Sequence, residues 1–328
     1  MKKSTYTIEE LESMMNANHG NLKFCHNKDL TGLPDNLTVC GNLDISFTSI
    51  TSLPDNLTVG GNLYMQDTQV ATLSNNLTVG GDIDISDTPI TSLPDGLTVK
   101  GNLFLLYTPI TELPDNLTVG GRLDIRHTSI TSLPENLKVG DSLFLADTQI
   151  TSLPENLTVE GGLNLRNTPI TSLPDNLKVG GNLYLEGTPI TSLPEGLEVG
   201  GWLYLAGTQI TSLPDDIKIM GGIYLNNSKI ASLPEGLKVG GNLNLNDTPI
   251  ASLPDNLTVY GDLYLENTPI TKLPENLTVG GRLDLCNTLI TSLPSNLKVG
   301  GHLLLEGTPI TSLSKGLQIG GYAMTSTR

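Results

Sequence analysis

Aromatic and arginine side chains recur at a few fixed places in this sequence. When residues 41–320 are written in rows of twenty, ten of the chain's aromatic residues (one Trp, nine Tyr and four Phe in all) fall at row positions 2, 4, 6 and 7. Four of its five arginines fall there too. Rings contribute apolar area with a polar tip, and guanidinium groups pair with carboxylates or phosphates, so these residues dominate many protein interfaces. The pattern therefore favours recognition of a partner over catalysis.

The candidate binding residues lie on two runs of consecutive rows. In the second run tyrosines recur at row position 4, so we expect rings on neighbouring strands to stack. Stability alone also favours aromatic residues on an exposed strand face, and the residues leave both interpretations open. The first run contains Phe104, Tyr107, Arg122, Arg126, His127, Phe144 and Arg166, and the second contains Tyr184, Trp202, Tyr204 and Tyr224.

The elements that position these residues follow from the repeat. Rows run without insertion from Gly41 to Gly320, with the consensus G-x-L-x-L-x-x-T-x-I-T-S-L-P-D/E-N/G-L-x-V-G. Leucines at positions 3 and 5 alternate with variable residues, which predicts a strand with one buried face. Positions 10, 13, 17 and 19 are also apolar, and stacked coils bury what one coil cannot. We expect a cap at residues 1–20, fifteen repeats over 21–320 (the first degenerate) and a tail at 321–328.

The corners of each row also carry predictions. Position 16 holds only Asn, Gly or Asp, which indicates a left-handed backbone. The Gly at position 1 follows a variable residue, which predicts a type II turn with Gly at its third place. Position 8 is Thr in nearly every row, and we expect these hydroxyls to bond the backbone of the next coil rather than to act as nucleophiles.

The row is similar to a known repeat. The segment Leu183-x-Leu185-x-x-Thr188-x-Ile190 resembles the LxLxxNxL core of leucine-rich repeats, with Thr in the place of the ladder Asn, and Leu193-Pro194 resembles the short twenty-residue bacterial type. The resemblance implies a right-handed β-solenoid coil with a parallel β-sheet on one face and turns and extended segments on the return side. A second short strand fits positions 17–19, and the strand face is either concave or flat.

The two ends of the chain differ. Residues 5–17 predict a short N-terminal cap helix, with a capping box made by Thr7 and Glu10. The last row loses its Pro and its acid, at Ser314 and Lys315. That end is either covered by the tail or left as an open edge that pairs with another copy, which would make a homodimer through the C-terminal edge.

Composition narrows the class of protein. The net charge of −16 and the pI near 4.5 disfavour binding to nucleic acid or to an anionic membrane. Three scattered cysteines, Cys25, Cys40 and Cys286, indicate a reducing compartment, and no stretch is apolar enough to span a membrane. The four histidines are too dispersed for a metal site or a catalytic triad. We therefore expect a cytoplasmic protein with no cofactor.

The functional prediction is a non-enzymatic scaffold that binds a protein partner through the outward strand face. The resemblance implies a bacterial or phage origin and leaves room for a secreted effector without a cleaved signal. Row position 15 is acidic in most rows, from Asp35 to Glu275. A first alternative is therefore an acidic decoy that mimics a nucleic acid, and a second is a structural unit that assembles with itself.

Overall fold

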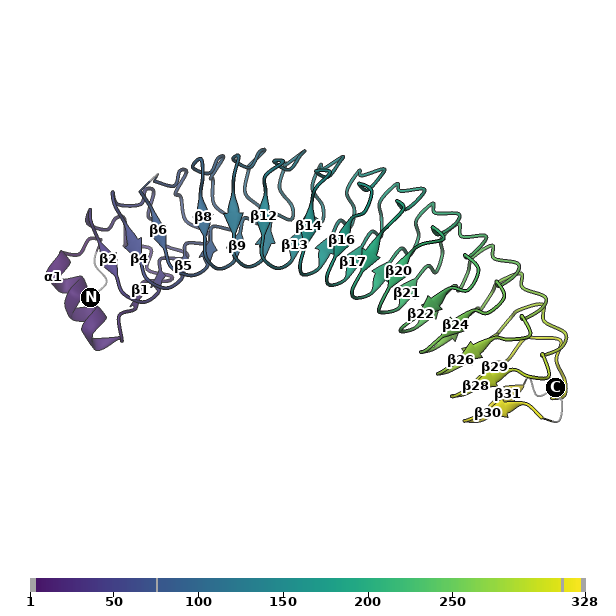
Figure 1. Ribbon diagram of the computed structural model, residues 1–328. Coiled ribbons are helices and arrows are strands. Elements are labelled where there is room, and N and C mark those ends of the chain that lie inside the picture. The colour runs from purple at the N-terminus through teal and green to yellow at the C-terminus, as the bar shows by residue number, and fades with distance from the viewer. Residues whose placement is uncertain (1–3, 75, 314–315, 326–328) are drawn as a thin grey trace. The chain divides into compact units, whose positions relative to one another are not determined.

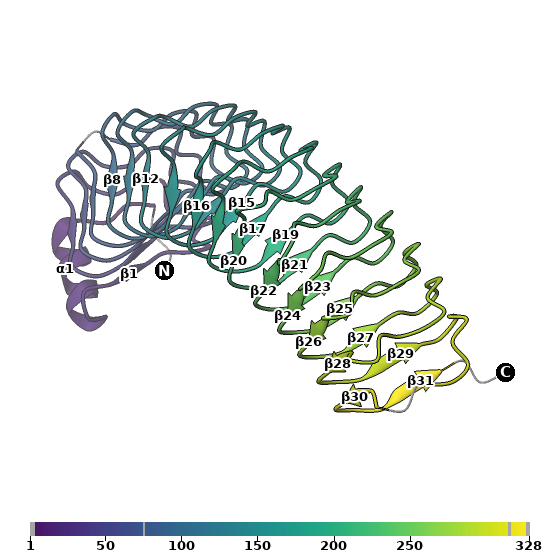
Figure 2. The same cartoon turned by 45° about the vertical axis from the view of Figure 1, so that its right-hand side comes forward.

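The computed structural model describes residues 4–74, 76–313 and 316–325, and it shows a coil that repeats every twenty residues (Figure 1, Figure 2). The chain divides into two compact units, residues 1–161 (unit 1) and 162–328 (unit 2). Every coil contains two short strands joined by a bend, then a turn and an extended return segment. The predicted solenoid, with a parallel sheet, an extended return side and an N-terminal helix, is confirmed.

Unit 1 begins with the helix α1 (Ile8–Ala17), and its strands follow in two series. The first series is one parallel sheet of β1 (Leu22–Lys23), β3 (Leu43–Asp44), β5 (Leu63–Tyr64), β7 (Ile83–Asp84), β9 (Leu103–Phe104), β11 (Leu123–Asp124) and β13 (Leu143–Phe144). The second series, on the return side, consists of β2 (Thr38–Val39), β4 (Thr58–Val59), β6 (Thr78–Val79), β8 (Thr98–Val99), β10 (Thr118–Val119), β12 (Lys138–Val139) and β14 (Thr158–Val159).

Unit 2 has two series of strands of the same kind. Its first series is a parallel sheet of β15 (Leu163–Asn164), β17 (Leu183–Tyr184), β19 (Leu203–Tyr204), β21 (Ile223–Tyr224), β23 (Leu243–Asn244), β25 (Leu263–Tyr264), β27 (Leu283–Asp284), β29 (Leu303–Leu305) and β31 (Ala323–Thr325). Its second series consists of β16 (Lys178–Val179), β18 (Glu198–Val199), β20 (Lys218–Ile219), β22 (Lys238–Val239), β24 (Thr258–Val259), β26 (Thr278–Val279), β28 (Lys298–Val299) and β30 (Gln318–Ile319).

The register places equal row positions side by side. Leu123 pairs with Leu103 on one side and with Leu143 on the other, so the position-3 leucines form a continuous buried line. In the coil that starts at residue 101, the inward side chains at positions 3, 5, 8, 10, 13, 17 and 19 are all buried. Strands at positions 18 and 19 confirm the short second strand of the return arm. Because neighbouring strands lie about 4.8 Å apart, side chains at one row position touch from coil to coil.

Row position 2 carries a hydrogen-bond ladder that the sequence analysis did not foresee. The N–H of Asn62 donates to Oδ1 of Asn42 at 2.8 Å, and the N–H of Asp82 donates to Oδ1 of Asn62 at 2.8 Å. In unit 2 the N–H of Trp202 donates to Oδ1 of Asn182 at 2.8 Å. Asn or Asp at this position ties its coil to the next.

The position-8 threonines bond within their own coil, so the expected bond to the next coil is wrong. The hydroxyls of Thr108 and Thr208 donate to the carbonyls of Leu105 and Leu205, each at 2.7 Å. Row positions 6 and 7 form a turn, which brings the carbonyl of the residue three places earlier within reach of the hydroxyl. In each coil that carries it, the threonine donates to one buried carbonyl and has a structural role.

The glycines of row position 1 are required by close packing and not by a type II turn. Gly61 and Gly81 lack the positive φ that such a turn needs at its third residue, so that prediction is wrong. A Cβ added at Gly61 would lie 3.0 Å from the carbonyl carbon of Gly41 in the preceding coil. Neighbouring coils approach closely at this corner, and within residues 41–320 only Asp141 carries a side chain at this row position.

Left-handed backbone occurs at two corners. At row position 16 it was predicted and is present in several rows, among them Asn36 (φ 58) and Asn176 (φ 57), whereas Asn136 does not adopt it. At row position 7 it was not predicted. Most rows place Asp, Asn or Gly there, which tolerate positive φ. The exceptions are Phe47, Tyr107 and His127.

The ends of the described chain differ as expected. Thr7 caps α1 and forms the predicted capping box with Glu10, and the helix buries Leu11 and Met15 against the first coil. At the other end, Tyr322 and Met324 near β31 are exposed. Of the segments on which the C-terminal prediction depends, residues 314–315 and 326–328 lie outside the described residues.

Candidate partner-binding patches

The predicted binding residues fall into one patch in each unit. Patch A, in unit 1, comprises Phe104, Tyr107, Arg122, Arg126, His127 and Phe144. Patch B, in unit 2, comprises Arg166, Tyr184, Trp202, Tyr204 and Tyr224. The sequence places Arg166 in the first run, but its ion pair and ring contacts are with unit 2 residues.

Patch A is built around a buried carboxylate that the sequence analysis missed. Asp124 in β11 pairs in register with Phe104 and Phe144 on the flanking strands, and its side chain is 0% exposed. Arg126 donates to both of its oxygens, from Nε and from Nη2, at 2.8 Å each. Arg122 forms a second ion pair with Oδ2. The sequence order Arg-Leu-Asp-Ile-Arg could have indicated this site, because it places one cation on each side of a single acid.

The guanidinium groups of patch A also lie against aromatic rings. The Arg122 guanidinium lies 3.9 Å from the centroid of Phe144 and 5.5 Å from that of Phe104, which is a cation–π arrangement. Its buried Nε has no hydrogen-bond partner among the described residues. Hydrogen bonding to Asp124 raises the pKa of Arg126, so this guanidinium stays charged. Two cations thus share one buried anion at the centre of patch A.

Tyr107 and His127 form a stacked pair at the side of patch A. Their ring centroids are 4.6 Å apart and their planes differ by 2°. Both residues have left-handed backbone, with φ of 55 and 58, a conformation that bulky side chains rarely adopt. Tyr107 is nevertheless 58% exposed, so burial does not compensate for the strain. Nδ1 of His127 lies 3.7 Å from Oδ2 of Asp147 in the next coil.

Patch B is a column of stacked rings. Tyr184 and Tyr204 have centroids 4.6 Å apart, and Tyr204 and Tyr224 have centroids 5.1 Å apart, with planes within 9° and 8° of parallel. Trp202 lies against Tyr224 at 5.5 Å. The predicted stacking is therefore present. It follows from the register, which pairs Tyr204 with Tyr184 and with Tyr224.

Arg166 closes one end of this column. Its guanidinium lies 4.5 Å from the centroid of Tyr184 and donates to Glu186 at 2.9 and 2.5 Å. Hydrogen bonding to Glu186 raises the pKa of Arg166. From the sequence we expect such arginines to pair with carboxylates of a partner, but Arg126 and Arg166 have carboxylate partners within the chain. They hold the patches in shape and contribute ring contacts and remaining N–H groups to the surface.

Both patches interrupt the position-2 ladder. Arg122 and Trp202 occupy row position 2, where an Asn would accept a hydrogen bond from the next coil, and both side chains only donate. The Trp202 ring crosses the next coil at Gly222, where an added Cβ would overlap the indole, and reaches Gly241 in the coil after that. The chain therefore gives up a structural hydrogen-bond acceptor within each patch.

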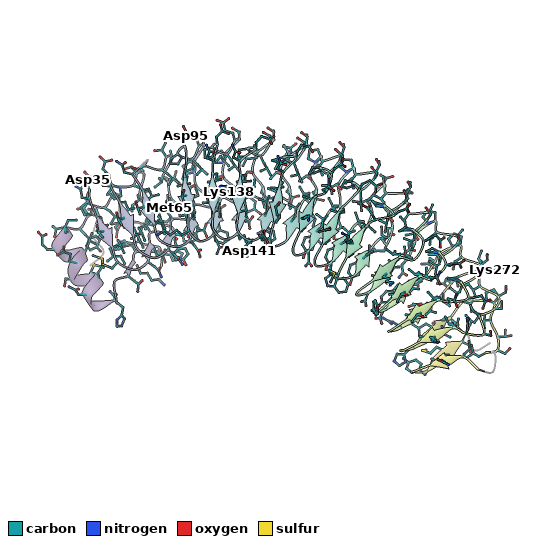
Figure 3. All side chains as sticks on the ribbon, in the orientation of Figure 1. Asp35, Met65, Asp95, Lys138, Asp141 and Lys272 are labelled. Atoms are coloured by element: carbon teal, nitrogen blue, oxygen red, sulfur yellow. The ribbon has the colours of Figure 1, made fainter. Side chains whose placement is uncertain are left out.

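Other chemistry finds little support among the described residues. They contain no group of three or more His, Cys, Asp or Glu side chains that could hold a metal ion. Burial, reinforced by Asp284, raises the pKa of the Cys286 thiol to about 12, which makes it a poor nucleophile. No helix among the described residues has the length and apolar composition needed to cross a membrane. The acidic side chains Asp35 and Asp95 lie on the opposite edge of the coils from Asp141 (Figure 3).

The repeated coil, the continuous parallel sheet within each unit and the ladder between coils define a leucine-rich-repeat type of fold. The structure resembles a leucine-rich-repeat protein of Leptospira interrogans, with 20% identity over 94% of this chain and 95% of that one, at a TM-score of 0.54. It also resembles a chain of the Drosophila Toll–Spatzle complex, with 14% identity over 90% of this chain and 55% of that one, at a TM-score of 0.56.

A third structure, the leucine-rich effector protein YopM from Yersinia pestis, is 20% identical over 97% of this chain and 92% of that one, at a TM-score of 0.49. The chain matches no protein-family model and no curated protein sequence. At these identities the solved structures establish the fold alone.

Proposed function

We propose that the chain is a non-enzymatic repeat scaffold that binds a protein partner through patch A and patch B. The observation that carries this proposal is the stacked pair of Tyr107 and His127, which holds two bulky residues in left-handed backbone while Tyr107 stays 58% exposed. Such conformations cost about 1–3 kcal/mol each and concentrate at functional sites. A coil that needed only to fold would use Asn, Asp or Gly there, as most other rows do.

The form of the patches favours a protein over a small ligand. Patch A extends from β9 to β13 and patch B from β15 to β21, so each covers several coils of strand face. The stacked rings cover one another's faces and present their edges, and an exposed ring edge provides contact area rather than an enclosed site. The Drosophila neighbour is itself part of a protein complex, which agrees with this use of the fold.

The test replaces each patch with residues that the same row positions use elsewhere. Tyr107→Asn with His127→Asn removes the strained pair of patch A, and Trp202→Asn with Tyr204→Asn removes the core of patch B. Asn occupies position 7 at Asn227, position 2 at Asn182 and position 4 at Asn244, so these variants are expected to fold. Wild type and variants are immobilised, and proteins retained from bacterial and eukaryotic lysates are quantified by mass spectrometry.

Matched controls carry similar substitutions outside the patches. In unit 1 the control is Asp87→Asn at row position 7, and in unit 2 it is Tyr264→Asn with Arg282→Asn at positions 4 and 2. Because truncating a hot-spot ring costs about 2 kcal/mol or more, retention of the partner should fall more than tenfold in the patch variants and stay unchanged in the controls. Equal retention by wild type and both patch variants would show that the partner is bound elsewhere.

Three narrower statements stay predictions: the bacterial or phage origin, the cytoplasmic location or secretion without a cleaved signal, and the homodimer through the C-terminal edge. The absence of direct nucleic-acid binding also stays a prediction. It rests on the net charge of −16.

A further inference from the structure

The first coil leaves two backbone donors of β2 unused. In the next coil the equivalent donors bond to the preceding coil: the N–H of Thr58 donates to the carbonyl of Leu37 at 3.0 Å, and the N–H of Gly60 donates to the carbonyl of Val39 at 2.7 Å. In β2 these donors are the N–H groups of Thr38 and Cys40. Neither has a hydrogen-bond partner among the residues that the structure describes. Both residues are exposed, so an incoming strand could reach these groups.

The helix α1 does not fill the place of a preceding strand beside β2. It contacts β1 at the start of the first coil, and β2 lies next to it in Figure 1. Between α1 and β2 a groove of about 690 Å³ remains. This volume is within the range of about 300–1,000 Å³ that ligand sites occupy. The free edge of β2 thus forms one wall of a cavity rather than a flat surface.

The lining of the groove specifies the kind of occupant. Ile8 and Met15 from α1 and Leu37 next to β2 provide an apolar wall, and Glu12 and His19 provide polar groups. Two amides in alternate positions along a strand match two carbonyls of an extended backbone. An apolar side chain would meet the apolar wall, and a basic side chain would meet Glu12 on a chain whose net charge is −16.

We propose that this groove binds an extended, basic segment of a partner polypeptide, which adds a parallel strand to the free edge of β2. The segment takes the place that a preceding coil would occupy, and its carbonyls accept from the N–H groups of Thr38 and Cys40. The site is separate from patches A and B, and it stands or falls independently of the function proposed for them.

The probe for this site is the peptide NLTVGKK. Its first five residues repeat residues 276–280, the segment that coils use to pair with the next coil. The two lysines are added to form an ion pair with Glu12. Binding of a fluorescent form to the full chain is measured by anisotropy up to about 1 mM, in low salt. The control peptide NSTSGKK keeps the charge and loses the apolar side chains. We expect NLTVGKK to bind and NSTSGKK to bind at least tenfold more weakly.

Two variants at one position test the backbone contact. Thr38→Pro removes one donor, and proline is tolerated where an edge N–H faces away from the sheet. Thr38→Val makes a similar change of side chain and keeps the N–H. Affinity for the peptide should fall about tenfold in the Pro variant and stay within twofold in the Val variant. Equal affinities, or no binding by wild type, would overturn the proposal.

Hydrogen exchange in the wild-type chain provides a readout that does not depend on the folding of the Pro variant. The peptide should slow exchange of the Thr38 and Cys40 amides at least fivefold and leave the Thr58 amide, which is already bonded, unchanged. Protection confined to other segments would place the peptide elsewhere and refute the site. Light scattering in the absence of peptide adds one more outcome: a dimer that Thr38→Pro abolishes would make a second copy the occupant, against the proposal.

Discussion

Replacing the exposed pair of Tyr107 and His127 with asparagines should make the protein more stable. Both residues have positive φ, and at the same row position most coils carry Asp, Asn or Gly. Asparagine tolerates left-handed backbone because its short polar side chain bonds locally. The double variant Tyr107→Asn with His127→Asn therefore relieves strain at two places without opening a cavity, since the Tyr107 ring is largely in solvent.

The magnitude follows from the contacts that are lost. Left-handed backbone costs an ordinary residue about 1–2 kcal/mol, so two substitutions should return about 2 kcal/mol or more. The stacked pair, with centroids 4.6 Å apart, contributes about 0.5–1.5 kcal/mol that the variant loses. His127 and Asp147 are each 37% exposed, and ion pairs in such positions contribute little. The net gain is about 1 kcal/mol, or roughly fivefold in the ratio of folded to unfolded chain.

Hydrogen exchange of the amides in β9 and β11 measures this gain locally, because long repeat arrays do not always unfold in one step. Urea unfolding followed by circular dichroism measures it for the whole chain. The control is Tyr260→Asn, which removes a ring that is 63% exposed on backbone without positive φ and should give no gain. Faster exchange in the double variant, or an equal gain in the control, would refute the strain argument.

Three further outcomes are expected. Thr208→Val removes the buried hydrogen bond from the Thr208 hydroxyl to the Leu205 carbonyl and should lower the urea midpoint by the equivalent of about 1 kcal/mol. An unchanged midpoint would show that this bond does not stabilise the fold. Iodoacetamide at pH 8 should modify the exposed Cys40 and leave Cys286, whose pKa is raised to about 12, and equal labelling in a mass spectrum would contradict that burial. The pKa of Glu195 is raised by its hydrogen bond to Asp216 on the next coil and by the like charges nearby. Moderate salt screens this repulsion between the acids of neighbouring coils and should raise the melting temperature. An unchanged or lower melting temperature would show that these acids do not repel one another.

The inward-facing half of the coil could be predicted from sequence because its rules repeat in every row. Alternating leucines at positions 3 and 5 define the strand, as in Leu103 and Leu105, and the apolar positions of the return arm define the rest of the core. The position-16 corner and the capping box of α1 were readable for the same reason: few residue types suit them.

The hydrogen bonds between coils could not be predicted, because they depend on which atoms the register brings together. Asn at position 2 reads as a variable polar residue until the structure shows Asn42 accepting from the next coil. In the sequence Asp124 does not differ from the other acids, and only the structure shows that Arg122 and Arg126 both form ion pairs with it. The strain at Tyr107 could not be predicted because the sequence did not reveal the turn at positions 6 and 7. Only the positive φ of the structure shows that a bulky residue is unusual there.

The position-2 ladder also distinguishes the tyrosines of patch B from one another. The Nδ2 of Asn182 donates to the hydroxyl of Tyr184 at 2.9 Å, so this ring is held by its own coil, and Arg166 covers its outer face. Tyr204 lies two residues after Trp202, as Tyr184 lies two residues after Asn182. Trp202 does not bond to the Tyr204 hydroxyl, and no hydrogen bond to that hydroxyl is present among the described residues. Stability alone accounts for Tyr184, because its ring and its hydroxyl both have partners. It does not account for Trp202, which replaces a ladder acceptor with a donor. Under the proposed function we therefore expect Trp202 and Tyr204, rather than Tyr184, to contact the partner.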